Sequence, residues 1–169
     1  HKWSGVSLAF LSFGYEIAVT PLQMAVAFNV PAAGGVRVRP QILRDGFRDG
    51  GNERVLSAAS SEQLGEIMSE VVRRGTGRKA QIAGLEIAGK TGTAHKIKAG
   101  RYAGNYVSSF GGFFPARDPR VTLFVIIDEP RGQYFGGDVA APLFKAIAEK
   151  VMLHLGILPG PPAVSEVRL

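Results

Sequence analysis

One short segment of the sequence combines a cation with two hydroxyl groups. Residues 88–94 read Ala-Gly-Lys-Thr-Gly-Thr-Ala. Lys90 supplies positive charge, and Thr91 and Thr93 supply hydroxyl donors. We predict a strand here, and a strand edge offers backbone amides that can bind a peptide or a developing oxyanion. Glycine within a strand indicates close approach by another backbone or by a ligand. Together these groups indicate a site for an anionic, peptide-like ligand.

The placement of these side chains leaves alternatives open. Strict alternation along a strand puts Thr91 and Thr93 on one face and Lys90 on the other. Lys90 must therefore reach round the strand edge, or the strand must twist. The Lys-Thr/Ser-Gly tripeptide also occurs by chance in about one chain in ten of this length. A solvated strand with a tightly packed glycine is the alternative interpretation.

Other groups capable of chemistry are sparse. The sequence has no cysteine, which excludes disulfides, zinc thiolates and a cysteine nucleophile. His1, His95 and His154 are far apart and have no carboxylate at ligand spacing, so we predict no metal site and no cofactor. His95 and Lys96, just beyond the segment, are expected to face solvent.

Size and charge indicate a globular chain with a basic surface. Its 169 residues are 46% hydrophobic and 20% charged, which suits one domain or a large piece of one. The net charge of +6 permits nucleic acid, anionic lipid or acidic cell-wall material as a partner. The nearest approach to a basic cluster is Arg73, Arg74, Arg78 and Lys79. It lacks interleaved aromatic residues, which favours a solvated basic face over a nucleic-acid interface.

Three helices are expected to position the segment. Thr20-Pro21 is a helix start, with Thr20 as N-cap and proline in the first turn. Ser60 and Gln63 form a capping box for the second helix, whose apolar face repeats at helical spacing. The expected ranges are 22–33, 60 to about 73, and about 138–155.

Three strands are expected at residues 85–95, 105–114 and 121–128. Asp118-Pro119 makes a tight connection, so the last two strands should be antiparallel neighbours. The last strand is almost continuously apolar, which predicts a position inside a sheet, with a further neighbour that the chain does not obviously supply. A shorter strand near 36–42 leads into a predicted loop or hairpin tip at 44–54. The fold class is α+β, with an antiparallel sheet of about three strands flanked by helices.

Several segments in the same order resemble class B penicillin-binding proteins, and the beginning Ser12-Phe13-Gly14-Tyr15 resembles the division-type enzymes. The Lys90–Thr93 strand resembles the Lys-Thr-Gly-Thr strand of that family at the expected later position. The resemblance covers about Trp3 to Leu158. The other matching segments are residues 17–25, 106–110, 118–121, 136–137 and 139–144.

The resemblance implies a fold, an activity and residue roles. The fold would be the penicillin-binding and serine β-lactamase-like one, of whose five-stranded sheet about three strands lie here. The family cross-links peptidoglycan by acyl transfer from a D-Ala-D-Ala stem peptide, and β-lactams acylate the same serine. Lys90 would assist proton transfer, and the backbone amide of Thr93 would contribute to the oxyanion hole. Thr91, Gly92 and Thr93 would bind the donor peptide or antibiotic, with the two hydroxyls holding its carboxylate.

The sequence departs from the family pattern at the nucleophile. No serine is followed by Lys at the third position or by Asn at the second, so both the Ser-x-x-Lys and Ser-x-Asn motifs are missing. We therefore expect residues 1–158 to be the carboxy-terminal part of a transpeptidase domain, inactive alone, with the nucleophile supplied from upstream. Residues 159–169 are expected to be a flexible Pro-rich tail. The parent would act at the periplasmic face of the cytoplasmic membrane, through an anchor outside this chain. The alternatives are a non-catalytic module that binds peptidoglycan peptides and, third, a nucleic-acid-binding protein.

Overall fold

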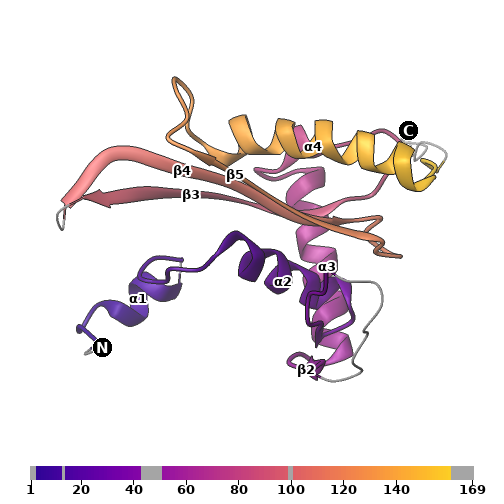
Figure 1. The fold of residues 1–169 in the computed structure, drawn as a ribbon, viewed down its shortest axis with the longest axis horizontal. Coiled ribbons are helices and arrows are strands. Elements are labelled where there is room, and N and C mark those ends of the chain that lie inside the picture. The colour runs from indigo at the N-terminus through magenta and orange to yellow at the C-terminus, as the bar shows by residue number, and fades with distance from the viewer. Residues whose placement is uncertain (1–2, 13, 43–50, 99–100, 161–169) are drawn as a thin grey trace, which may run out of the picture.

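One antiparallel sheet with helices on both faces organises the chain (Figure 1). The computed structural model describes residues 3–12, 14–42, 51–98 and 101–160. The strands are β3 (Ala88–Lys98), β4 (Arg101–Phe114) and β5 (Val121–Asp128), in the order β3-β4-β5. Both pairings are antiparallel, which confirms the predicted α+β class and the hairpin through Asp118-Pro119. β3 begins three residues later than predicted, whereas β3 and β4 both extend further toward their hairpin because the pairing continues past an irregularity between His95 and Ile97.

Helix α4 (Gly136–Leu155) covers one face of the sheet (Figure 1). Alternate residues of β4 and β5 point toward it, as the period of a strand requires. Phe110 lies edge-on to Phe144 of α4, with ring centroids 4.7 Å apart. The buried core on this side also contains Phe114, Val125, Ala140, Ala141, Ala148 and Met152.

Helix α2 (Pro21–Ala32) lies against the opposite face (Figure 1). Its predicted start is confirmed, because Thr20 and Gln23 each bond the other's backbone N–H, at 3.2 and 2.8 Å. Phe28 packs on Phe124 of β5 with ring centroids 5.6 Å apart. A Cβ at Gly111 of β4 would lie 2.5 Å from the Phe28 ring, so this contact requires glycine.

Helix α3 (Ala58–Arg73) begins earlier than predicted. Ser57, not Ser60, is the N-cap, since the Ser57 hydroxyl accepts a hydrogen bond from Ser60 N–H at 3.0 Å. Two alanines follow Ser57, and alanine is the strongest helix former, so the helix gains its first turn there. The end at Arg73 is as predicted, and a short 3₁₀ turn, η1 (Arg78–Ala80), leads toward β3.

The remaining elements are short. Helix α1 spans Ser7–Ser12, and β1 (Val36–Arg37) pairs with β2 (Glu53–Arg54) as a small hairpin. The predicted loop at 44–54 falls largely outside the described residues. Gly160 N–H still donates to Gly84 O at 2.7 Å, and residues 161–169 of the predicted tail are not described. Within the described ranges, the helices are too short or too polar to cross a membrane.

Strand β5 lacks a second neighbour among the described strands, as the sequence predicts for an interior strand whose other neighbour this chain does not obviously supply. Among the described strands it pairs with β4 alone, so its other side is a sheet edge. Val125 is its buried residue, whereas Ile126 is 41% exposed. Helices α4 and α2 contact β5 from the two faces of the sheet.

Candidate active-site strand

The predicted site lies on β3, the opposite edge strand of the sheet. Lys90, Thr91, Gly92 and Thr93 pair with residues 111, 110, 109 and 108 of β4, respectively. Among the described strands β3 has no second neighbour, so its outer edge is unpaired. An unpaired edge presents backbone N–H and C=O groups to an incoming strand or peptide.

The strand places its cation and its hydroxyls on different faces. Thr91 and Thr93 pair with Phe110 and Ser108, whose side chains point into the layer of α4. Lys90 pairs with Gly111, which faces α2. The Lys90 side chain is exposed and turns back so that Nζ donates to the carbonyl oxygen of Thr91 at 2.9 Å. The ammonium group therefore stays beside the strand backbone, next to the residues that carry the hydroxyls.

Each threonine hydroxyl has a partner from a different element. Thr91 Oγ1 and Thr76 Oγ1 share a hydrogen bond of 2.8 Å, and Thr76 lies in the loop between α3 and η1. Thr93 Oγ1 accepts a hydrogen bond of 3.0 Å from the backbone N–H of Gly136, the first residue of α4. The side chains are thus held by the loop after α3 and by the start of α4.

Glycines allow these close contacts. A Cβ at Gly92 would lie 2.5 Å from Ser109 Oγ, so a neighbouring side chain accounts for the glycine within the strand. A Cβ at Gly136 would lie 2.3 Å from Gly92 O and 2.5 Å from Ser109 O. Only glycine at position 136 lets the start of α4 touch the strand backbone.

Aromatic residues gather at the same end of α4. Tyr106 stacks on Tyr134 with ring centroids 3.9 Å apart, and the ring centroids of His95 and Tyr106 lie 4.2 Å apart. Burial, followed by the hydrogen bond with Tyr134, raises the pKa of Tyr106. The backbone N–H of His95 also donates to the Tyr15 hydroxyl at 3.2 Å. The expectation that His95 faces solvent is therefore wrong.

The sequence carried only part of the signal for this aromatic cluster, which consists of Tyr15, His95, Tyr106, Tyr134 and Phe135. His95 and Tyr106 occupy paired positions of the β3–β4 hairpin, so correct strand register would have brought them together. Tyr134 joins them through the loop before α4, and no local pattern predicts that contact.

Lys96 is also not simply solvated. Its Nζ lies 2.9 Å from Asp128 and 3.0 Å from Glu129, at the end of β5. The hydrogen bond to Asp128 is the largest cause of a raised pKa for Lys96. The Asp128-Glu129 pair therefore acts as a structural counterion for Lys96.

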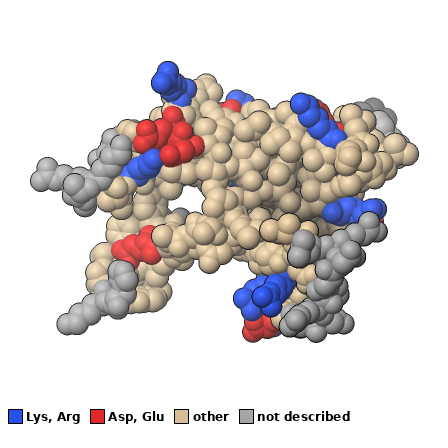
Figure 2. Space-filling view, in the orientation of Figure 1, with Lys and Arg blue, Asp and Glu red and all other residues tan. Residues whose placement is uncertain are grey.

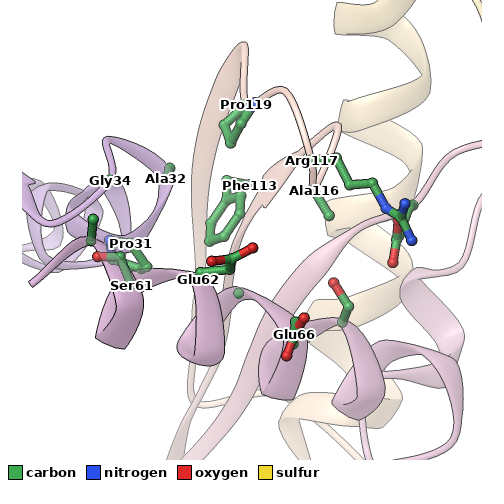
Figure 3. Close-up of a pocket in the computed structure, with 14 residues that line it drawn as sticks. Pro31, Ala32, Gly34, Ser61, Glu62, Glu66, Phe113, Ala116, Arg117 and Pro119 are labelled. Carbon is green, nitrogen blue, oxygen red and sulfur yellow. The ribbon is translucent and has the colours of Figure 1, made fainter.

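A cavity of about 520 Å³ lies away from this strand, between α2, α3 and the β4–β5 turn (Figure 3). Glu62 and Phe113 point into it from α3 and β4, and Glu66, Glu86 and Arg117 also line it. Lys90, Thr91, Gly92 and Thr93 are not among its lining residues. Three carboxylates disfavour an anionic ligand there, so the β3 edge remains the candidate site.

Charge and potential metal ligands give no competing site. On the face shown in Figure 2, Lys and Arg side chains are scattered and several lie beside acidic residues. The described part of the chain has no group of three or more His, Asp or Glu residues that could hold a metal.

Comparison with known proteins identifies the family. The profile described as "Penicillin binding protein transpeptidase domain" matches residues 1–149. The peptidoglycan D,D-transpeptidase FtsI of Escherichia coli K12 is 38% identical over 161 residues, which cover 94% of this chain and 27% of FtsI. The stage V sporulation protein D of Bacillus subtilis is 35% identical over 167 residues, covering 91% of this chain and 26% of that protein.

Solved structures agree in fold. The transpeptidase domain of Burkholderia pseudomallei penicillin-binding protein 3 matches with a TM-score of 0.82 and 32% identity, over 95% of this chain and 50% of that one. Penicillin-binding protein 3 of Mycobacterium tuberculosis, solved with aztreonam, matches with a TM-score of 0.79 and 33% identity. The match covers 96% of this chain and 41% of that one. The chain spans about a quarter to two fifths of the length of its curated relatives. With this sequence match and this shared fold, the chain belongs to the penicillin-binding-protein transpeptidase family.

Proposed function

We propose that this chain is the carboxy-terminal part of a serine-type peptidoglycan D,D-transpeptidase and that the Lys90–Thr93 strand forms one side of its active site. The observation that carries the proposal is the arrangement on the unpaired edge strand β3. Two hydroxyls, each with a protein partner, stand on one face, and an ammonium group lies beside the backbone between them. This arrangement suits a peptide that ends in a carboxylate.

The roles follow from the chemistry of acyl transfer. A serine oxygen attacks the carbonyl carbon of the penultimate D-Ala, the terminal D-Ala leaves with a proton, and an amine of a second stem peptide then takes the acyl group. We assign the donor carboxylate to the hydroxyls of Thr91 and Thr93. The Thr93 backbone amide would bind the developing oxyanion, and one such preorganised donor commonly contributes about 3 kcal/mol.

Lys90 and Gly92 complete the assignment. Lys90 would hold positive potential at the site and take part in proton transfer to and from the serine. Gly92, where a Cβ would lie 2.5 Å from Ser109 Oγ, would leave the strand backbone open to the donor peptide. The resemblance to the family motif supports these roles alongside the geometry.

The nucleophile would come from another segment of the same domain. The sequence contains neither Ser-x-x-Lys nor Ser-x-Asn, and it corresponds to about half of the solved transpeptidase domain from B. pseudomallei. Below, "whole transpeptidase" means this chain joined to the segment that carries those motifs. We place that enzyme at the outer face of the cytoplasmic membrane, where stem peptides occur, with its membrane anchor outside this chain. β-Lactams would be its inhibitors.

Labelling with a fluorescent penicillin tests this proposal. The whole transpeptidase should become covalently labelled, and excess unlabelled benzylpenicillin should prevent it. This chain alone should remain unlabelled, because it lacks the nucleophilic serine of the Ser-x-x-Lys motif. Labelling of the chain alone would show that it contains a nucleophile of its own, and an unlabelled whole transpeptidase would refute the assignment.

The missing serine motifs favour one alternative, a non-catalytic module that binds peptidoglycan peptides. Such a module must bind without a partner segment. Titration of this chain with a peptide ending in D-Ala-D-Ala distinguishes the two: saturable binding by the chain alone supports the module, whereas binding only by the whole transpeptidase supports the enzyme.

A further inference from the structure

The loop between α3 and η1 contacts the active-site strand through one side chain. Thr76 Oγ1 lies 2.8 Å from Thr91 Oγ1, although 15 residues separate the two along the chain. Thr76 has no counterpart in the Lys-Thr-Gly-Thr motif, and nothing in its local sequence indicates a role at the site.

This loop is held firmly at both ends. The N–H groups of Gly75 and Gly77 both donate to Val71 O at 3.0 Å, which ties the loop to the last turn of α3. A Cβ at Gly77 would lie 3.2 Å from the Phe110 ring, so the loop also packs against β4. A Thr76 side chain carried on such a backbone has a fixed position relative to β3.

The start of α4 holds the loop from the other side. A Cβ at Gly137 would lie 2.5 Å from Thr76 O and 3.6 Å from the Thr91 methyl group, so α4, the loop and the strand meet here. Lys79 of η1 forms an ion pair of 2.9 Å with Asp138 of α4. Three elements therefore meet at the Thr76–Thr91 pair, which remains accessible to solvent.

The hydrogen bonds decide where the hydroxyl protons can point. A hydroxyl has one proton and two lone pairs. Thr93 Oγ1 accepts from Gly136 N–H, so its own proton remains for a ligand. If Thr76 donates to Thr91, the Thr91 proton also remains, and both threonines present donors to the same anion. Hydrogen bonds in such a chain strengthen one another.

We propose that Thr76 is a positioning residue, which fixes the Thr91 side chain and orients its hydroxyl as a donor to the carboxylate of the bound peptide or β-lactam. This inference rests on the proposed function of the Lys90–Thr93 strand. Thr76 acts through Thr91 and does not itself touch the reacting atoms.

The test is the acylation kinetics of the whole transpeptidase, separated into a binding constant and an acylation rate constant. Thr76→Val keeps the shape of the side chain and removes the hydroxyl. We expect benzylpenicillin binding to weaken about threefold to tenfold, the usual effect of losing one hydrogen bond, with a smaller change in the acylation step. Thr76→Ser, which keeps the hydroxyl, should restore binding to near the wild-type value.

Benzylpenicillin methyl ester separates positioning from general damage. The ester lacks the carboxylate, so wild type and Thr76→Val should react with it equally. Thr91→Val should weaken benzylpenicillin binding by itself, and adding Thr76→Val to it should have little further effect. Thr122→Val is the matched control, because its hydroxyl donates to Asn29 at 2.9 Å in the α2 layer and its loss should leave acylation unchanged.

Two results would overturn the inference while leaving the proposed function intact. One is that Thr76→Val binds benzylpenicillin as tightly as the wild type does. The other is an equal loss toward penicillin and its ester, which would mean that Thr76 only supports the fold. Absence of acylation in the wild-type whole transpeptidase would instead remove the proposed function, and this inference with it.

Discussion

Lys90 and Lys96 stand six positions apart on the same strand, but their surroundings differ. Lys90 is exposed and its ammonium group bonds the backbone of the next residue. Lys96 is 28% exposed and is bound by Asp128 and Glu129, which raise its pKa. The charge of Lys90 is therefore available to a ligand at the strand, whereas the charge of Lys96 is compensated by two carboxylates. This comparison gives a matched pair of variants.

We predict that Lys90→Ala lowers the rate of penicillin acylation by the whole transpeptidase about 100-fold or more, since loss of a proton-transfer group commonly has that effect. Lys96→Ala removes a lysine of equal size from the same strand and should leave acylation near wild type, with a lower thermal midpoint. Stopped-flow or gel-based labelling measures the rates. Unchanged acylation in Lys90→Ala would remove Lys90 from the mechanism.

At the scale of elements, the site depends on where two helices end and begin. α3 ends at Arg73, so that Thr76 reaches β3, and α4 begins at Gly136, so that its first N–H reaches Thr93. The other end of α3 is capped by Ser57, three residues before the serine whose local sequence fits a capping box. Which of these two serines caps the helix can be tested by measuring the stability of variants.

We predict that Ser57→Ala lowers the free energy of unfolding by about 1 kcal/mol, the usual effect of losing an N-cap. Ser60→Ala should lower the free energy of unfolding clearly less, because Ser60 lies within the first turn of the helix. Its hydroxyl accepts a hydrogen bond of 2.9 Å from the Ser57 hydroxyl and does not cap the helix. Urea denaturation of the two variants gives both values. A larger loss of stability in Ser60→Ala than in Ser57→Ala would show that Ser60 is the N-cap, as the capping box predicts.

At the scale of the whole molecule, the sheet has two different edges. The β3 edge carries the polar residues of the proposed site. The β5 edge is apolar, and its residues are less buried than such a sequence normally requires. The chain also matches only about half of the solved domain from B. pseudomallei, with a TM-score of 0.82. We therefore expect a further strand from the rest of the domain to pair with β5.

Hydrogen exchange tests this pairing. In an antiparallel pair, alternate amides point toward one neighbour and the others point away. The β5 amides that point away from β4 should exchange rapidly in this chain alone and slowly in the whole transpeptidase, whereas those bonded to β4 should be slow in both. Equal protection of the outward amides in the two proteins would show that no added strand covers this edge.

The sequence by itself determined much of this protein. It predicted the α+β class, the antiparallel order of the strands, the Thr20 cap, the end of α3 and the strand that carries Lys90, Thr91 and Thr93. These features depend on local signals: residue alternation, capping side chains, turn residues and a short motif. The family match supports the resemblance on which the function rests.

Only the tertiary structure decided which residues meet across the fold. Thr76 with Thr91, Gly136 with Thr93 and Tyr134 with Tyr106 come from segments 15 to 43 residues apart. Their contacts depend on how α3, α4 and the sheet pack, and packing follows from the summed shape of many side chains rather than from any one segment. For the same reason the burial of β5 could not be taken from its composition, because burial depends on which neighbours cover it.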